Sequence, residues 1–288
     1  MQRLAFPAMG TGIEVLLDGP PSRAARAALA AVRAEFERLE RTFSRFRADS
    51  ELTRLNESGS IEASDDMREV VELALAARER TAGRFDPTLL DALVAAGYDR
   101  SFDELDERVA PDPDARCAAG GRVRVHGSRI ELGAGVRLDL GGIVKGFAAD
   151  RCARRLSELG PCLVNAGGDL AVGGDRGGEP WPVAVRLPRG QLTLGVAAGG
   201  LATSGRDRRR WRRRGEEHHH LIDPATRRPA AGAPLAVTVA APSATEAEVL
   251  AKAVFLAGAG AARQAERFGT PAAIVAADGE VRLVGGLA

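Results

Sequence analysis

The sequence predicts an α+β fold, a mixed body of largely antiparallel sheets with flanking helices. Short apolar runs come in pairs around glycine-bearing turns, a pattern typical of β-hairpins. Longer segments between them repeat apolar residues at intervals of three and four, which predicts amphipathic helices. No linker or internal repeat divides the 288 residues. We therefore expect a single domain over residues 1–288, made of two closely joined lobes.

Composition places the chain among globular proteins. Apolar residues make up 45% and the formal net charge is +1, so global charge favours neither nucleic acid nor a membrane surface. The three cysteines form no Cys-x-x-Cys pair, and we expect Cys152 and Cys162 in the core. No apolar run reaches the roughly 18 residues of a membrane span, and the N-terminus lacks a signal-peptide core. We expect a cytoplasmic protein without membrane insertion.

The N-terminal third predicts a hairpin followed by helices. Residues 3–7 and 13–17 read as strands around the turn Met9-Gly10-Thr11-Gly12. Ser22 can cap a long helix, whose buried face holds Leu29, Val32, Phe36, Leu39 and Phe43. Residues 50–56 predict a short capped helix. Another begins at residues 64–67 and ends near Gly83; its apolar face holds Val70, Leu73, Ala74 and Ala77.

Asp86-Pro87 leaves two interpretations open. The residue before a proline is held extended, and Pro87 suits the first turn of a following helix. Asp86 is then either an N-cap or a carboxylate available to a ligand. The helix continues through Leu89, Leu90, Leu93 and Val94. Residues 99–120 are charged and weakly patterned, which predicts a surface excursion.

The junction over residues 138–150 is the segment of the sequence most indicative of a ligand site. An apolar run from Val136 to Leu140 predicts a strand, two glycines predict a turn, and a helical pattern follows Gly146. A helix N-terminus presents unpaired N–H groups and a positive dipole, and Lys145 adds a full charge. The arrangement suits a phosphate or pyrophosphate. A purely structural turn is the alternative, since neither common nucleotide motif is present.

The C-terminal half predicts mostly hairpins, with two helices near its end. Hairpins are expected at 123–125 with 129–132, at 183–187 with 191–196, and at 272–276 with 281–283. Residues 163–172 read as one strand interrupted by Gly167-Gly168, where a ligand or another backbone approaches closely. Strands at 201–205 and 237–241 and helices after Pro242 and at 261–268 complete the pattern.

Two polar segments invite functional interpretations. Arg206 to Arg214 holds seven arginines around Trp211, so nucleic-acid binding is one interpretation. A solvated hairpin tip is favoured, because the protein is otherwise neutral. His218 to His220 contains three of the four histidines. At most His218 and His220 share a strand face, which makes acid–base chemistry or phosphate binding a better interpretation than metal ligation.

Six short motifs occur in order along most of the chain. They are Phe-Ser-Arg-Phe with Ser-Glu-Leu-x-x-Leu-Asn, Gly-x-Phe-Asp-Pro, Leu-Asp-Leu-Gly-Gly-Ile-x-Lys-Gly, Asn-x-Gly-Gly-Asp, Ala-Thr-Ser-Gly and His-x-Ile-Asp-Pro. This series, from Met9 to Gly258, resembles the ApbE family, the FAD:protein FMN transferases. The resemblance implies an FAD cleft between two lobes and a divalent ion, usually Mg²⁺, on the pyrophosphate. It implies cleavage of FAD, attachment of FMN through a phosphoester to a Thr or Ser of an acceptor flavoprotein, and release of AMP.

The resemblance also assigns roles to single residues. His220 takes the catalytic position of the base, and Lys145 with Asp139 would hold the pyrophosphate and ribose. Met9 would contact the flavin, and Phe46 stands where the family often has Tyr. The rest of the FAD pocket would be lined by Arg84, Phe85, Asp86 and Leu221.

The family's metal-binding positions correspond here to Gly142, Glu248 and Lys252, where the family carries Asp and Thr at the last two. A protonated lysine cannot ligate Mg²⁺. Two hypotheses follow: Lys252 replaces the metal, or the site is lost and the protein holds FAD without cleaving it. Hydrolysis of FAD to FMN and AMP, with water as the acceptor, is a further alternative. The sequence does not identify the acceptor protein, the oligomeric state or the role of the Arg206–Arg214 segment.

Overall fold

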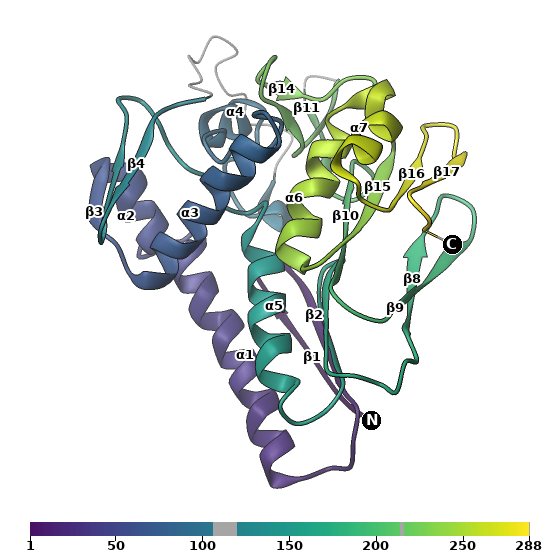
Figure 1. Ribbon diagram of the computed structural model, residues 1–288. Helices are drawn as coiled ribbons and strands as arrows, with labels where there is room; N and C mark the ends of the chain where they lie inside the picture. The colour runs from purple at the N-terminus through teal and green to yellow at the C-terminus, as the bar shows by residue number, and fades with distance from the viewer. Residues whose placement is uncertain (106–119, 214–215, 288) are drawn as a thin grey trace.

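The computed structural model describes residues 1–105, 120–213 and 216–287, and it has one large antiparallel sheet at its centre (Figure 1). The eight strands run in the order β1-β2-β6-β7-β10-β15-β16-β17. Their bounds are Gln2–Ala8, Thr11–Leu17, Cys162–Ala166, Asp169–Gly173, Gly200–Gly205, Ala236–Ala241, Ala272–Val275 and Val281–Val284. Sequence neighbours pair through short turns at β1–β2, β6–β7 and β16–β17. The predicted α+β class with largely antiparallel sheets is confirmed.

Helices α1, α5, α6 and α7 pack against the central sheet, and serine side chains cap the starts of four helices of the described chain. The helix bounds are α1 Arg23–Phe43, α2 Glu51–Ser58, α3 Asp65–Arg80, α4 Leu90–Ala95, α5 Val144–Leu156, α6 Ala244–Phe255 and α7 Ala261–Phe268. The N-cap hydroxyls of Ser22, Ser50, Ser64 and Ser243 each accept a hydrogen bond from a backbone N–H three residues later. This geometry confirms the capping predicted at Ser22, and α1 buries the predicted apolar face.

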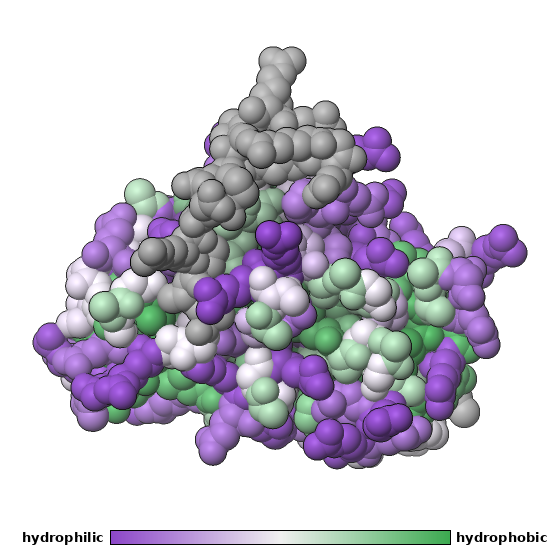
Figure 2. All heavy atoms as spheres, turned by 90° about the horizontal axis from the view of Figure 1, so that it is seen from above, coloured by the Kyte–Doolittle hydropathy of each residue, from purple (hydrophilic) through white to green (hydrophobic). Residues whose placement is uncertain are grey.

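Short strands form small sheets around the main one. The three-stranded sheet joins β3 Ser60–Glu62, β5 Arg129–Leu132 and β4 Val123–His126, and β8 Trp181–Arg186 pairs with β9 Gln191–Val196. Two further pairs are β11 Arg210–Arg213 with β12 Glu216–His219, and β13 Ile222–Asp223 with β14 Arg228–Pro229. Seen from above, hydrophilic side chains dominate the rim of the molecule, with apolar groups between them (Figure 2).

Strand alternation divides the core into layers. Val164 and Ala171 pack with α1 and α5, whereas Leu163 and Leu170 face the opposite way and pack with Trp181 of β8. Successive side chains of a strand point to opposite faces, so both faces of the central strands are covered. Cys152 and Cys162 are buried as predicted, and Cys117 lies outside the described residues. Within the described residues, no helix has the length and apolar character needed to cross a membrane.

The strand predicted at 136–140 is wrong, because these residues belong to none of the strands in the described part of the chain. Their backbone is held by side-chain and loop groups instead. The Asn56 amide donates to the Leu138 carbonyl at 2.9 Å and accepts from its N–H at 2.7 Å, and Asp139 N–H donates to the Pro87 carbonyl at 2.8 Å. The helix then begins at Val144, so Lys145 lies in its first turn.

The single strand predicted at 163–172 is also wrong, because Gly167 and Gly168 form the two-residue turn of the β6–β7 hairpin. Both have positive φ, which glycine tolerates. A Cβ on Gly167 would lie 2.2 Å from Thr11 Oγ1, so the expected close approach exists and its partner is the β2 edge.

Three smaller predictions concern single residues and one loop, and long-range contacts explain the two that fail. Leu73 is 38% exposed rather than buried. Asp86 caps no helix, because α4 begins only at Leu90; its carboxylate accepts from Thr88 N–H and Oγ1 and from Gly120 N–H. Most of the excursion predicted at 99–120 lies outside the described residues.

Candidate active site

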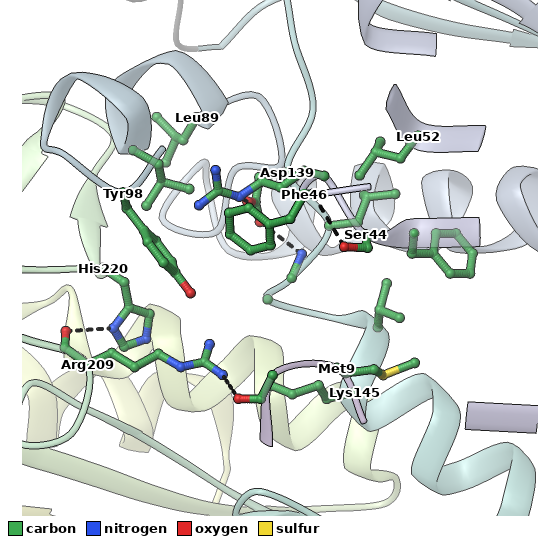
Figure 3. A pocket seen from close by; sticks show the side chains of 18 of the residues that line it. Met9, Ser44, Phe46, Leu52, Leu89, Tyr98, Asp139, Lys145, Arg209 and His220 are labelled. Carbon is green, nitrogen blue, oxygen red and sulfur yellow. Dashed lines mark hydrogen bonds and ion pairs between the residues drawn. The ribbon is translucent and has the colours of Figure 1, made fainter. Parts of the chain in front are cut away.

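One cavity, of about 440 Å³, is lined by every predicted site residue except Glu248. These are Met9, Phe46, Arg84, Phe85, Asp86, Asp139, Gly142, Lys145, His220, Leu221 and Lys252. A second groove lies between α3, α5 and α6 and has a volume of about 670 Å³. None of the predicted site residues lines it. Segments from both halves of the chain therefore converge on one cavity (Figure 3).

Met9 enters the cavity from the β1–β2 turn. Met9 and Gly10 have φ values of 52° and 63°, the left-handed pair that suits a two-residue hairpin. A methionine is strained in this conformation. Arg209 Nη2 donates to the Gly10 carbonyl at 3.2 Å, so a residue of the arginine-rich segment fixes the turn that presents Met9.

A stack of aromatic rings around Arg45 forms one wall of the cavity. The sequence predicted Phe46 there but not Arg45 or Tyr98. The Arg45 guanidinium lies 4.1 Å from the Phe46 ring centroid and 4.6 Å from that of Tyr98. Phe46 is 40% exposed, so its ring is open to a ligand. Arg45 lies inside the Phe-Ser-Arg-Phe motif, and this position could have predicted it as a site residue. Tyr98 belongs to none of the motifs.

Asp139 is held rigidly at the cavity floor. One carboxylate oxygen accepts from Gly141 N–H at 2.8 Å, and the other pairs with Arg45 Nε at 2.7 Å. The backbone contacts of Leu138 with Asn56 fix the residue before it. Asp139 therefore faces the cavity as an anion already oriented by partners.

Lys145 is bound by two buried carboxylates. Its ammonium contacts both Asp169 and Glu248, and the second oxygen of Glu248 accepts from Gly146 N–H at 2.9 Å. Burial alone would lower the pKa of Lys145, but the two carboxylates outweigh it and raise the pKa. Burial, reinforced by Glu248, raises the pKa of Asp169 to about 6 against the opposing effect of Lys145.

The residues at the predicted metal positions do not suit a divalent cation. Both oxygens of Glu248 are already engaged, and a Cβ on Gly142 would lie only 1.8 Å from Lys252 Nζ. A protonated ammonium has no lone pair to donate. At about 4 Å and an effective dielectric constant of about 20, it would repel a doubly charged ion by about 8 kcal/mol. Among the described residues, no cluster of three or more His, Cys, Asp or Glu side chains could hold a metal ion.

His220 lies at the end of the β11–β12 hairpin, opposite Tyr98 (Figure 3). Its Nδ1 lies 3.5 Å from the Arg209 carbonyl, which favours the tautomer with hydrogen on Nδ1 and a free lone pair on Nε2. Burial, together with the charges of Arg209 and Lys252, lowers the pKa of His220 well below its usual value. The imidazole is therefore neutral at pH 7 and able to accept a proton.

Three predicted ligand residues have structural roles in the cavity wall. Phe85 and Leu221 are 3% and 1% exposed, so they belong mainly to the core beneath the cavity. Asp86 fixes the loop through Thr88 and Gly120, as described above. Arg84 lines the cavity directly.

Part of the arginine-rich segment belongs to a hairpin, in which residues 210–213 pair with residues 216–219; Arg214 lies outside the described residues. Trp211 packs on Tyr98 at 5.6 Å between ring centroids and donates from Nε1 to the Ala96 carbonyl at 3.0 Å. Arg210 pairs with Glu217 across the hairpin at 3.6 Å. Trp211 therefore anchors the hairpin to the cavity wall and is not a free stacking surface.

Comparisons with known proteins agree with this geometry. The family model "ApbE family" matches residues 9–275. An FAD:protein FMN transferase of Treponema pallidum (strain Nichols) is 32% identical over 272 residues, covering 83% of this chain and 73% of that protein. One of Klebsiella pneumoniae (strain 342) is 29% identical over 263 residues, covering 83% and 74%.

Solved structures show the same fold. The ApbE protein of Thermotoga maritima gives a TM-score of 0.88 at 27% identity, covering 98% of this chain and 96% of that one. The apo form of the Pseudomonas stutzeri flavinyl transferase ApbE gives 0.84 at 27% identity, covering 98% and 94%. With the family match spanning nearly the whole chain and the predicted residues gathered in one cavity, this chain belongs to the ApbE family.

Proposed function

We propose that this chain is an FAD:protein FMN transferase, which cleaves FAD and attaches FMN to a threonine or serine of an acceptor flavoprotein. The observation that carries the proposal is one cavity lined by His220, whose pKa is lowered, by both lysines and by an aromatic wall. Relatives that match over most of this chain bear the same activity in their names. In this proposal, residues 1–288 act as one domain.

His220 is the proposed general base. The acceptor hydroxyl oxygen attacks the phosphorus of the FMN half, and the bond from that phosphorus to the bridging oxygen breaks. AMP leaves with the electron pair on the bridging oxygen, and His220 Nε2 takes the hydroxyl proton. A positioned base contributes about 100-fold to 10,000-fold to such a step.

The other residues would bind and orient FAD. The exposed Phe46 ring offers a stacking surface for a flavin or adenine ring. Met9 would contact the flavin, and Asp139 would accept from ribose hydroxyls. Lys145, in the first turn of α5, pairs with the two buried carboxylates and offsets one of their two negative charges. The positive end of the helix dipole at the start of α5 favours a pyrophosphate placed beside it.

No step of this reaction uses Mg²⁺, because Gly142, Glu248 and Lys252 do not suit a divalent ion. A non-catalytic FAD-binding protein would use the same cavity without releasing AMP. An FAD hydrolase would release AMP with water as the acceptor. These alternatives are distinguished by their products.

The test compares wild-type protein with His220→Gln, using FAD and a flavin-carrying acceptor subunit that bears a threonine attachment site. We expect AMP release and FMN attachment to fall about 100-fold or more in the variant. FAD affinity should stay within about threefold, because the imidazole acts on the acceptor hydroxyl. Tight FAD binding by wild-type protein without any AMP would contradict transfer. AMP without labelled acceptor would indicate hydrolysis.

A further inference from the structure

Lysine is almost absent from this chain, and both of its lysines line the same cavity. Of the 40 residues that are Lys or Arg, only Lys145 and Lys252 are lysines. Arginine supplies the positive charge everywhere else. A guanidinium is broad and planar, whereas an ammonium is a compact point charge. The two lysines therefore indicate that a compact cation is needed at positions 145 and 252.

The two lysines differ in what their charges face. Lys145 is in contact with the carboxylates of Asp169 and Glu248. The remaining oxygen of Glu248 accepts from Gly146 N–H. Within the described residues, neither carboxylate forms a hydrogen bond or an ion pair with Lys252.

Lys252 directs an unpaired ammonium to the cavity surface. Across residues 1–105, 120–213 and 216–287, no hydrogen bond or ion pair engages Nζ, although the residue lines the cavity. Its nitrogen lies 5.6 Å from the Phe85 ring centroid, over the ring face. A Cβ on Gly142 would lie 1.8 Å from Nζ, so only a glycine there allows the ammonium to reach this place.

The same place lies beside the start of α5. Gly142 precedes the first turn of that helix by two residues, and a helix start favours a negatively charged ligand. The Lys252 ammonium and the positive end of the α5 dipole therefore both lie near Gly142. Together they suit the two phosphates of a dinucleotide, each of which carries a negative charge.

We propose that Lys252 is the built-in cation for the FAD pyrophosphate, so that this protein cleaves FAD and transfers FMN without a divalent metal ion. This inference rests on the proposed function. The Lys252 ammonium donates hydrogen bonds to pyrophosphate oxygens as the phosphorus–oxygen bond breaks. It stabilises the charge that the leaving AMP phosphate gains, and it keeps its own proton.

The experiment measures AMP release from FAD by wild-type, Lys252→Met and Lys252→Thr proteins, each in excess EDTA and in Mg²⁺. Wild-type rates are expected to agree within about twofold in the two buffers, whereas Lys252→Met falls about 100-fold in both. Lys252→Thr, which removes the ammonium and supplies a hydroxyl oxygen, should be inactive in EDTA and recover in Mg²⁺. Loss of wild-type activity in EDTA with recovery in Mg²⁺ would overturn the inference.

FAD binding separates a failure of this inference from a failure of the proposed function. Calorimetry in EDTA should give a Kd about tenfold higher for Lys252→Met than for wild type, the effect of one charge-assisted hydrogen bond. Arg186→Met, on the exposed side of β8, removes a positive charge outside the cavity and should change neither Kd nor rate. If no protein releases AMP, the proposed function fails. Equal Kd values for wild type and Lys252→Met would overturn the role of Lys252 whatever the activity.

Discussion

The side-chain amide of Asn56 pairs with both backbone polar groups of Leu138, at 2.9 and 2.7 Å, although 82 positions separate them. The amide thereby supplies the two hydrogen bonds that the backbone of a neighbouring strand would otherwise supply to Leu138. Because Asp139 follows directly, a residue at the end of α2 fixes a carboxylate of the active site. The pairing links the Ser-Glu-Leu-x-x-Leu-Asn motif to the Leu-Asp-Leu-Gly-Gly motif.

Asn56→Ala should destabilise the protein by about 2 kcal/mol, because it leaves a partly buried N–H and C=O without partners. Urea unfolding followed by circular dichroism measures the change. Asn56→Asp keeps the acceptor for Leu138 N–H and loses only the donor, so its loss should be smaller. A change within about 0.5 kcal/mol for the alanine variant, the usual range for a neutral surface site, would contradict the role of this pairing.

Gly146 permits the close contact of α5 with the start of α6. A Cβ on Gly146 would lie 2.5 Å from the Ala244 carbonyl oxygen and 2.7 Å from Thr245 N, and neither backbone atom can move freely. Gly146→Ala should cost about 2 kcal/mol and lower Tm by about 5 °C, as measured by calorimetry. Gly260→Ala is the control, since nothing lies within 4 Å of a Cβ there; an equal loss in both variants would contradict the account.

His219 should make stability depend on pH. Its Nδ1 accepts from Leu221 N–H at 3.3 Å and its Nε2 faces the Ala230 carbonyl at 3.2 Å, so both nitrogens are engaged in the neutral form. Burial lowers the pKa of His219, so the unfolded chain binds a proton more readily than the folded one. Stability should therefore decline as pH falls below about 6.5, the unfolded value.

Urea unfolding of wild type and His219→Gln at pH 7 and pH 5 isolates this effect. The variant should lose less stability than wild type over that interval, because glutamine does not titrate. Equal losses in both proteins would show that His219 does not contribute to the pH dependence.

The two lysines should react differently with an amine reagent. Burial lowers the pKa of Lys252, whereas the carboxylates around Lys145 raise the pKa of that lysine. At mildly alkaline pH, trinitrobenzenesulfonate should label Lys252 faster than Lys145, and FAD should protect Lys252. Peptide mass mapping measures both rates, with the α-amino group as the unprotected reference. Equal labelling of the lysines, or labelling of Lys252 unaffected by FAD, would contradict this arrangement.

Local signals predicted most of the helices and hairpins correctly. The Ser22 and Ser50 caps, the apolar stripe of α1 and the turns of β4–β5 and β8–β9 depend on residues close in sequence. The motif series also predicted which residues would line one cavity. Such features need no knowledge of distant contacts.

The failures have long-range causes. The 136–140 segment has a strand-like sequence, but Asn56 and Pro87 take the place of its strand partner. Leu73 follows the helical period and still lies beside an open groove. The stack of Arg45 on Tyr98 joins residues whose pairing no local pattern encodes.

The central claim is tested most directly by the intact mass of a threonine-bearing acceptor flavoprotein after incubation with FAD and this protein in excess EDTA. The account predicts that the acceptor gains one FMN phosphoester, that AMP appears in equal amount, and that a Thr→Val acceptor gains nothing. An acceptor of unchanged mass in both EDTA and Mg²⁺, with FAD intact, would contradict the assignment of this chain as a flavin transferase.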